Sequence, residues 1–371
     1  MSLFSAMEKK ITLCTVCMNR MTYLMQTLPV NLAENAENPN VEFLVLDYNS
    51  RDDMETWIKD HLSGYIGLGL LKYYKTYEPE FFHLAHSKNL IMKLATGDII
   101  GMVDADNYTG PGYVEWVQER FAANGDHTVT TTLRKDSIPY RDQGGKICLR
   151  KEFFHAVKGF DEALIGYGMD DVDLVNRLDV AGCKRVFIEE EKHLQFISHS
   201  DEERMINYRY PSNLTSIYHC VSDKDNHKAR FFYLFLDNRF SEMTYEFNEE
   251  LQNNLVITYV GWTIKRHGQR EGRYKWEGNR LVFIFDKEVE ISAYKQSSGF
   301  LHPEDVLRGG SWRHISRDEG LYSLAKLGYC ECLNRLKLIE NEKALEAVNT
   351  SGWGKGTVYM NFDHSSPIRV V

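Results

Sequence analysis

The sequence has no apolar run of about 18 residues, which is the length that a membrane-spanning helix needs. Basic residues are in the minority, because 53 acidic residues face 44 basic ones and the formal net charge is −9. Such a chain repels a nucleic-acid backbone unless basic residues gather on one face, and no run of lysines and arginines does this. Residues 1–10 lack the apolar core of a secretion signal. These absences predict a soluble, cytoplasmic protein that binds no nucleic acid.

Cysteine is scarce, and its number, 7, is odd. This fits reduced thiols better than a framework of disulfides. Cys14 and Cys17 form a CxxC pair, but a zinc site needs a second pair of ligands at matching spacing. The pair also lies inside the strand-like run ITLCTV. We therefore expect both thiols to be buried as small apolar side chains rather than to serve zinc or redox chemistry.

Short β-branched runs alternate with helix-length segments between residue 10 and about residue 190. The runs are ITLCTV, VEFLVLD, GLLKYY, DIIGMVD, HTVTTTL, KICLR and KRVFI. This alternation predicts an α/β fold with a mostly parallel sheet and helices on both faces. Helices are expected after Asn19, from Leu84 to Ala95, and from the acidic cluster at Asp170. Pro29 should kink or shorten the first of them.

The pattern changes after about residue 240. LVITYVGWTI, REGRYKWEGN and RLVFIFDKEVEISAY are typical of antiparallel strands joined by turns, and residues 303–347 have a helical pattern. We predict two domains, residues 1–235 and a smaller, β-rich domain with C-terminal helices at residues 236–371. Two domains fit the chain length, since single cores stop growing near roughly 250 to 300 residues.

Acidic and polar residues follow three of the predicted strands. Asp47 ends VLD, Asp104 and Asp106 lie in VDADN, and Asn19 and Arg20 follow TVCM. In open α/β sheets, ligands bind beyond the carboxyl ends of the strands. The DADN element is not an EF-hand, because the sixth loop position is not glycine. Its two carboxylates instead suit Mg²⁺ or Mn²⁺, hard ions that also bind phosphate.

A second acidic cluster lies in GYGMDDVDLVNRL, residues 166–178. Asp170, Asp171 and Asp173 stand between a glycine-rich turn and an amphipathic run. Helix capping is one explanation, since the partial positive charge of a helix N-terminus favours acidic residues. A catalytic role is the alternative, and it needs partner residues elsewhere in the chain.

Five blocks of the sequence, taken in order, resemble GT-A glycosyltransferases. The similarity is to the inverting family 2 enzymes and the β-1,4-galactosyltransferases. The blocks are CMNR, VLDYNSRDD, HSKNLIMKLATGDIIGMVDADN, GGKICLRKEFFHAVKGFDE and GYGMDDVDLVNRL. The resemblance implies a Rossmann-like GT-A fold and metal-dependent, inverting transfer of a sugar from a nucleotide-sugar donor to a glycan or lipid-linked glycan. It also suggests a UDP-hexose such as UDP-Gal or UDP-GalNAc, and a role in bacterial surface polysaccharide synthesis.

The resemblance also assigns roles to individual residues. Those expected to bind the donor are Asn19, Arg20, Asp47, Asn49, Asn89 and Asp104. Those expected to hold Mn²⁺ or Mg²⁺ are Asp104, Asp106 and His199. The family's methionine ligand falls on Phe196, which cannot coordinate a metal, so this sequence departs from the family there. A carboxylate and an imidazole together with phosphate oxygens suit Mn²⁺.

Asp171 is the expected general base, Asp170 the expected hydrogen-bond partner of the acceptor sugar, and Asp173 a structural or capping group. Spacing in the sequence leaves retention open, which a carboxylate that attacks the sugar itself would give. A non-catalytic glycan- or nucleotide-binding protein on the same scaffold is the alternative function. A nucleotidyltransferase is disfavoured, because TVCMNRMTY has neither the lysine nor the glycine of a triphosphate loop.

The last third of the chain resembles no family. Its tryptophans, Trp262, Trp276, Trp312 and Trp353, could stack on sugar rings, but core packing is the favoured interpretation. The hypothesis for this region is binding of the acceptor glycan or self-association. The oligomeric state stays open, and a peripheral position at a membrane is compatible with the sequence.

Overall fold

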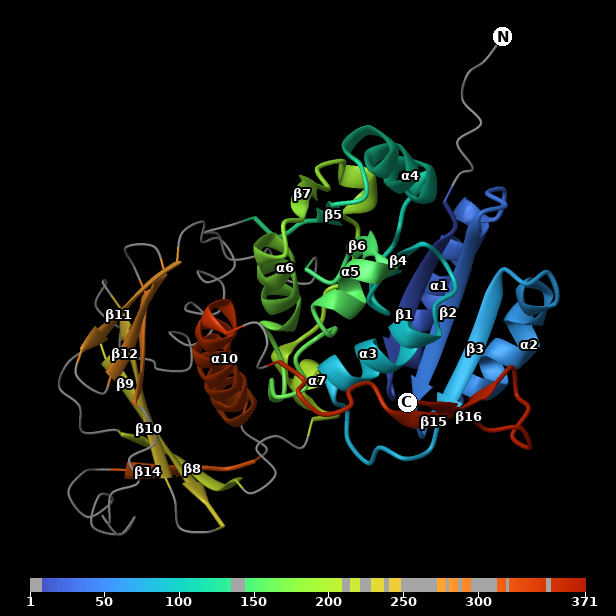
Figure 1. The fold of residues 1–371 in the computed structure, drawn as a ribbon. Coiled ribbons are helices and arrows are strands. Elements are labelled where there is room, and N and C mark those ends of the chain that lie inside the picture. The colour runs from blue at the N-terminus through green and yellow to red at the C-terminus, as the bar shows by residue number, and fades with distance from the viewer. Residues whose placement is uncertain are drawn as a thin grey trace.

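The protein is described here by a computed structural model. It describes residues 9–134, 144–208, 214–220, 228–236, 240–247, 272–277, 280–285, 289–294, 312–317, 320–344 and 348–371. Two sheets organise these residues, one nine-stranded and one seven-stranded, and helix α10 (Gly320–Lys343) lies between them (Figure 1). No helix in the described ranges has both the length and the hydropathy that a membrane span requires.

The nine-stranded sheet has the order β16-β15-β3-β2-β1-β4-β6-β5-β7. Its strands are β1 (Ile11–Cys17), β2 (Val41–Tyr48), β3 (Leu71–Thr76), β4 (Ile99–Met102), β5 (Thr128–Thr131), β6 (Ile147–Arg150), β7 (Lys184–Phe187), β15 (Gly356–Met360) and β16 (Ile368–Val370). The central strands β3, β2, β1 and β4 are parallel, whereas β6 is antiparallel to both neighbours. Every residue of β1 and β2 is buried, as expected for a parallel sheet covered on both faces. The predicted α/β architecture is confirmed.

Two hydrophobic clusters lie on opposite faces of this sheet. Helices α1 (Met21–Asn35), α2 (Met54–Gly67) and α4 (Tyr113–Asn124) pack on one face. Helices α3 (Leu84–Leu94), α5 (Lys151–Ala156) and α6 (Asp170–Val180) pack on the other. Cys14 and Cys17 are buried thiols, one in each cluster, as expected. Pro29 does not shorten α1, because the buried face that includes Leu24 and Leu28 holds the helix against the sheet.

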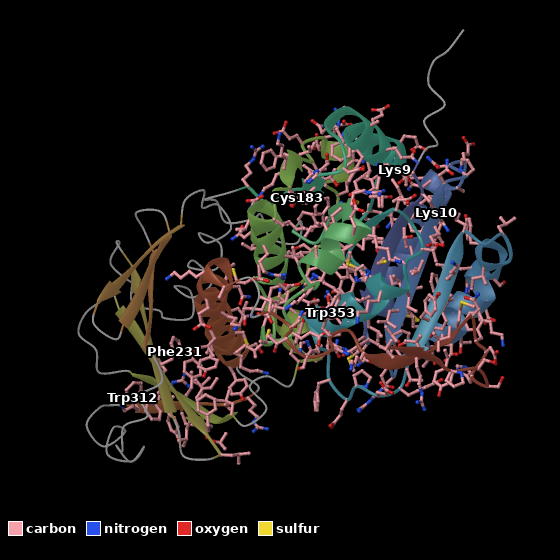
Figure 2. The ribbon with its side chains drawn as sticks, in the orientation of Figure 1. Lys9, Lys10, Cys183, Phe231, Trp312 and Trp353 are labelled. Carbon is pink, nitrogen blue, oxygen red and sulfur yellow. The ribbon has the colours of Figure 1, made fainter. Side chains whose placement is uncertain are left out.

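The seven-stranded sheet is antiparallel, with the order β11-β12-β13-β10-β9-β8-β14. Its strands are β8 (Leu214–Cys220), β9 (Lys228–Phe235), β10 (Phe240–Phe247), β11 (Gly272–Glu277), β12 (Arg280–Phe285), β13 (Val289–Tyr294) and β14 (Trp312–Ile315). The predicted strand LVITYVGWTI lies outside the described residues. Trp312 packs against Phe232 and Trp353 against Phe154, so both tryptophans contribute to packing. Figure 2 labels Trp312 on the second sheet and Trp353 on the C-terminal segment.

The C-terminal segment, residues 348–371, returns to the first sheet. β15 pairs antiparallel with β3, with Tyr359 opposite Lys75 and Met360 opposite Tyr74. The pairing covers an edge strand that would otherwise expose unpaired backbone groups. The second sheet starts at Leu214, and the end of the chain pairs with the first sheet, whereas the domain boundary at residue 235 stays a prediction.

Candidate active site

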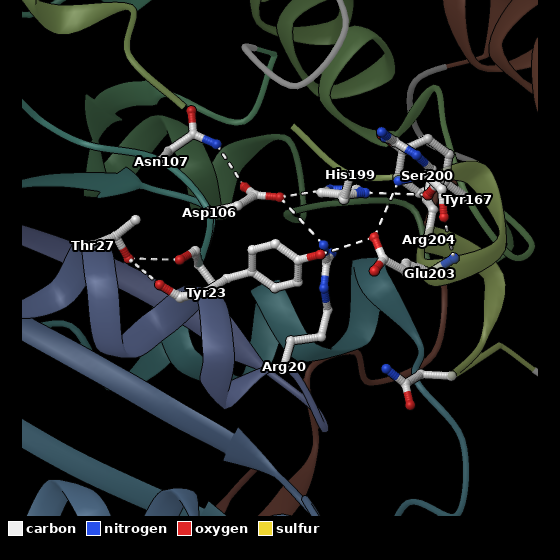
Figure 3. Close-up of polar contacts among 12 residues, drawn as sticks. Arg20, Tyr23, Thr27, Asp106, Asn107, Tyr167, His199, Ser200, Glu203 and Arg204 are labelled. Atoms are coloured by element: carbon white, nitrogen blue, oxygen red, sulfur yellow. Dashed lines mark hydrogen bonds and ion pairs between the residues drawn. The ribbon is translucent and has the colours of Figure 1, made fainter. Parts of the chain in front are cut away.

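The candidate site lies beyond the carboxyl ends of β1 and β4, and Asp106 is its best-connected residue (Figure 3). Asp106 Oδ2 lies 2.8 Å from His199 Nε2 and 3.6 Å from Arg20 Nη2. Its Oδ1 accepts a hydrogen bond of 2.7 Å from Asn107 Nδ2. The guanidinium of Arg20 also lies over the ring of Tyr23, at 4.5 Å from the ring centroid. The guanidinium of Arg20 and the imidazole of His199 therefore converge on the buried carboxylate of Asp106.

A short backbone ladder brings His199 to Asp106. Ile197 N donates to Asp106 O at 2.8 Å, and Asn107 forms an isolated antiparallel bridge with Phe196. The buried Lys146 fixes the preceding turn, because its Nζ donates to the carbonyl oxygen of His193 at 2.5 Å. Phe196 therefore serves this ladder through its backbone.

The two carboxylates of the DAD element have opposite electrostatic surroundings. Burial alone would raise the pKa of Asp106, but the hydrogen bond from His199 and the charge of Arg20 outweigh it and lower that pKa. Burial raises the pKa of Asp104, and the charges of Asp106 and Asp170 add to this against the opposing charge of Lys88. Asp106 is the carboxylate held ionised.

Gly145 allows Asp104 to lie where it does. A Cβ atom on Gly145 would fall 1.9 Å from Asp104 Oδ2, so any other residue here would push the carboxylate away. Gly145, the second glycine of GGKICL, is therefore required by the close approach of backbone to carboxylate.

Asp170 and Asp171 begin α6 and share one buried cation. Lys88, which is 1% exposed, places Nζ 2.6 Å from Asp170 Oδ2 and 2.7 Å from Asp171 Oδ1. Burial and the neighbouring charge of Asp170 raise the pKa of Asp171 to about 7, although Lys88 acts in the opposite direction. Gly166, Gly168 and Met169 have positive φ angles and form the turn that precedes α6. The side chain of Asp171 is 17% exposed and can meet a ligand.

Asp173, two residues further on, is a structural residue. Its Oδ2 lies 2.6 Å from Arg177 Nη2, and its Oδ1 accepts a hydrogen bond of 2.7 Å from Asn341 in α10. Both Asp173 and Arg177 are 1% exposed. Arg177 also donates to the carbonyl oxygens of Val157 and Gly159, so the pair ties α6 to the preceding loop.

Asn334 in α10 holds the turn in front of α6. Its side-chain oxygen accepts from Ile165 N at 2.9 Å, and its amide donates to Ile165 O at 2.9 Å and to Gly168 O at 2.8 Å. The side chain is 1% exposed. Sequence reasoning missed this residue, because a single asparagine in a helical pattern carries no signal of a distant partner.

The residues expected to bind the nucleotide differ in how deeply they are buried. Asp47 is fully buried and accepts hydrogen bonds of 2.7 Å from Ser50 N and from Tyr73 Oη. Asn89 is also fully buried, and it bonds both the N–H and the carbonyl oxygen of Phe160. These two residues support neighbouring loops from inside the protein.

Asn19 and Asn49 are half-buried, and both have positive φ angles. Asn19 Nδ2 donates to Asn207 Oδ1 at 3.0 Å, and Asn49 Nδ2 donates to Pro79 O at 2.7 Å. The structure thus brings together one set of predicted residues at the site: Arg20, Asp104, Asp106, Asp170, Asp171 and His199.

The predicted metal ligands are only partly assembled. Within the described residues, no group of three or more histidine, cysteine or acidic side chains could hold a metal ion. Asp106 and His199 do converge, and a carboxylate with an imidazole is a donor pair that Mn²⁺ accepts. The donor chemistry therefore fits a divalent ion whose remaining ligands come from phosphate oxygens or water.

Comparison with known proteins places two family models on the chain. Residues 12–170 match the model described as glycosyl transferase family 2. Residues 130–219 match the model described as the N-terminal domain of galactosyltransferase. The two ranges overlap across the segment that carries Asp170. A search of curated proteins gave no match.

The solved structures that match the chain include a mannosyltransferase from Pyrobaculum calidifontis in complex with GDP-Man and Mn²⁺, at 17% identity and a TM-score of 0.41. The alignment covers 50% of this chain and 56% of that chain. Residues 1–349 of S. aureus TarS match at 14% identity and a TM-score of 0.40, covering 53% of this chain and 61% of that chain. This chain thus spans less than two thirds of either.

The nine-stranded sheet, with acidic residues beyond its carboxyl ends, is an α/β, Rossmann-like arrangement of the kind expected for a GT-A glycosyltransferase. The chain resembles glycosyltransferases of family 2 over residues 12–170 and the galactosyltransferases over residues 130–219.

Proposed function

We propose that this protein is an inverting, metal-dependent glycosyltransferase that moves a hexose from a nucleotide sugar to a glycan or lipid-linked glycan. The observation that carries the proposal is the placement of Asp171. Its carboxylate is partly exposed, shares Lys88 with Asp170, and is electrostatically coupled to Asp104 of the DAD element. A base and a site for a charged leaving group thus lie in one cluster.

In the proposed reaction, Asp171 takes the proton of the acceptor hydroxyl. The acceptor oxygen then forms a bond to the anomeric carbon, and the bond from that carbon to the nucleoside diphosphate breaks with its electron pair on the phosphate oxygen. A base with a pKa near neutral pH combines a useful ionised fraction with affinity for the proton. Attack from the face opposite the leaving group inverts the anomeric centre.

Arg20, Asp106 and His199 would handle the leaving group. Arg20 brings positive charge to the carboxyl end of β1, where it lies 3.6 Å from Asp106. Asp106 and His199 would hold Mn²⁺ or Mg²⁺, with Asp104 beside them, and the ion would neutralise charge on the departing diphosphate. Asp170 would accept a hydrogen bond from the acceptor sugar.

The proposed donor is a UDP-hexose, with UDP-Gal and UDP-GalNAc the first choices. The galactosyltransferase model supports this choice, because its match includes the acidic block that starts α6. The proposed setting is bacterial surface polysaccharide synthesis in the cytoplasm. The mannosyltransferase from Pyrobaculum calidifontis binds GDP-Man, and residues 1–349 of S. aureus TarS bind UDP-GlcNAc, so both donors belong in the panel.

The test is release of free nucleoside diphosphate from a panel of UDP- and GDP-sugars, with and without Mn²⁺. The native protein should release nucleoside diphosphate from one donor in a metal-dependent manner, and Asp106→Ala should lose this release. Donor binding without release, even after glycan acceptors are added, would contradict the proposal and support a non-catalytic nucleotide-binding protein.

A further inference from the structure

A side pocket lies apart from the Asp106 cluster. Its volume is about 560 Å³, which is within the range of ligand pockets. The residues that matter for its chemistry are Tyr48, Phe81, Phe82, Glu78, Glu162 and Lys355. Arg20, Asp106 and His199 do not line it. The rings of Phe82 and Tyr208 pack edge to face at 5.3 Å, and Tyr208 continues toward Tyr167 in the turn before α6.

The charge of the side pocket disfavours an anionic ligand. Glu78 and Glu162 contribute two carboxylates, whereas Lys355 is the one lysine among the lining residues, and no arginine is among them. Burial and the neighbouring His86 lower the pKa of His83, so this histidine adds no positive charge at neutral pH. A nucleoside diphosphate would meet net negative charge here. A neutral, hydroxyl-rich ligand would not.

Hydrogen bonds hold Glu162 and His86 in place, partly from the C-terminal segment and partly from Asn89 and Tyr48. Glu162 Oε1 accepts hydrogen bonds from Asn89 Nδ2 at 2.9 Å and from Gly354 N at 2.7 Å. His86 lies between Tyr48 Oη at 2.7 Å and Lys355 O at 2.8 Å. Each of these contacts fixes a wall without a ligand, so the pocket is preformed.

The side pocket also shares a wall with the loop that carries the candidate base. Leu164, Ile165 and Gly166 line it, and the chain then runs directly into Asp170 and Asp171. Asn334 forms hydrogen bonds with the backbone of Ile165 and Gly168 on that loop. A ligand in the pocket would therefore lie next to the segment that positions Asp171.

We propose that the side pocket binds a neutral saccharide, namely the part of the acceptor glycan behind the sugar that receives the transferred hexose. The inference rests on the proposed function. Aromatic rings offer faces on which sugar rings stack, and carboxylates accept hydrogen bonds from sugar hydroxyls. Phe81 and Phe82 supply the rings, and Glu78 and Glu162 supply the carboxylates.

The test measures binding of the full-length protein to an array of neutral, fluorescently labelled oligosaccharides, without any donor. At least one oligosaccharide should bind, and Phe81→Ala should weaken it roughly 10-fold. Tyr77→Ala is the matched control, because Tyr77 lies on the same loop but packs against Tyr359 and His364. Absence of any bound saccharide, or equal binding by native protein and Phe81→Ala, would overturn the proposal.

A second measurement separates saccharide from nucleotide. Glu78→Gln removes one negative charge while preserving the size of the side chain. It should weaken saccharide binding and leave the dissociation constant of UDP unchanged. Tighter UDP binding by Glu78→Gln, or weaker UDP binding by Phe81→Ala, would assign the pocket to the donor and overturn the proposal. Neither measurement needs turnover, so failure of the proposed function would show separately as absent nucleoside diphosphate release.

Discussion

The first turn of α6 holds three carboxylates, and the surroundings of Asp173 differ from those of Asp170 and Asp171. Asp173 has a guanidinium for one oxygen and an amide for the other, and it is 1% exposed. Asp170 and Asp171 share the single ammonium of Lys88, with Asp104 as a further negative charge nearby. The same residue type, at the same helix end, is neutralised in one case and left with excess negative charge in the other.

This difference separates a carboxylate that stabilises the fold from the carboxylate that we propose as the general base. Burial raises the pKa of Asp173 as well, against the opposing charge of Arg177, but both of its oxygens are engaged and the side chain is closed to ligands. Asp171 shares its cation with a second acid, and burial together with the charge of Asp170 raises its pKa to about 7, so it can exchange a proton near neutral pH. Helix capping explains neither set fully, because no carboxylate of this cluster stands at the N-cap, which is Met169.

The largest expected effect is on stability, and it comes from breaking the ion pair between Asp173 and Arg177. Arg177→Met leaves Asp173 as a buried charge without its cation, and we expect the free energy of unfolding to fall by about 3 to 5 kcal/mol. Chemical denaturation followed by circular dichroism measures this. Arg185→Met, which removes a more exposed pair with Asp179, is the control and should cost far less. Equal costs would contradict the distinction.

A smaller effect is expected from Asn334 of α10, which supports the turn before the proposed catalytic residues Asp170 and Asp171. Asn334→Ala removes the hydrogen bonds to Ile165 and Gly168, and we expect kcat for transfer to fall roughly 10-fold with little change in donor KM. Asn341→Ala, which loosens Asp173 instead, should lower stability more than kcat. A loss of stability without a selective loss of kcat in Asn334→Ala would show that this residue only supports the fold.

Much of the fold and part of the site could be predicted from the sequence. The alternation of buried runs and helices gave the parallel sheet, and the resemblance paired Asp106 with His199, which lie 2.8 Å apart. The return of β15 could not be predicted, because a five-residue strand carries no signal of its partner. The burial of Asp47 could not be predicted either, because its partner Tyr73 lies on the adjacent strand β3, far away in the sequence.

The smallest and most specific effect is on pH dependence. Asp171 must be ionised to act as a base, and burial together with Asp170 raises its pKa to about 7. Transfer should therefore fall roughly 10-fold per pH unit below about pH 7 and level off above it. A steady-state rate profile between pH 5 and pH 9 measures this, with donor binding followed separately. A flat profile would contradict the assignment.

The raised pKa of Asp171 also makes the stability of the protein depend on pH. Unfolding lowers the pKa of Asp171 toward its ordinary value, so the stability linked to this group is greatest at low pH and is lost as pH rises through about 7. Asp171→Asn cannot ionise and avoids this loss. At pH 8 it should be at least as stable as the native protein.

The central claim is tested most directly by comparing Asp171→Asn with Asp173→Asn, with transfer rate, donor binding and unfolding measured for each. We predict that Asp171→Asn lowers transfer by at least about 100-fold while it retains donor binding and stability. Asp173→Asn should lower stability markedly and, where it remains folded, retain far more transfer. Full transfer by Asp171→Asn would contradict the account, because it would remove the proposed general base.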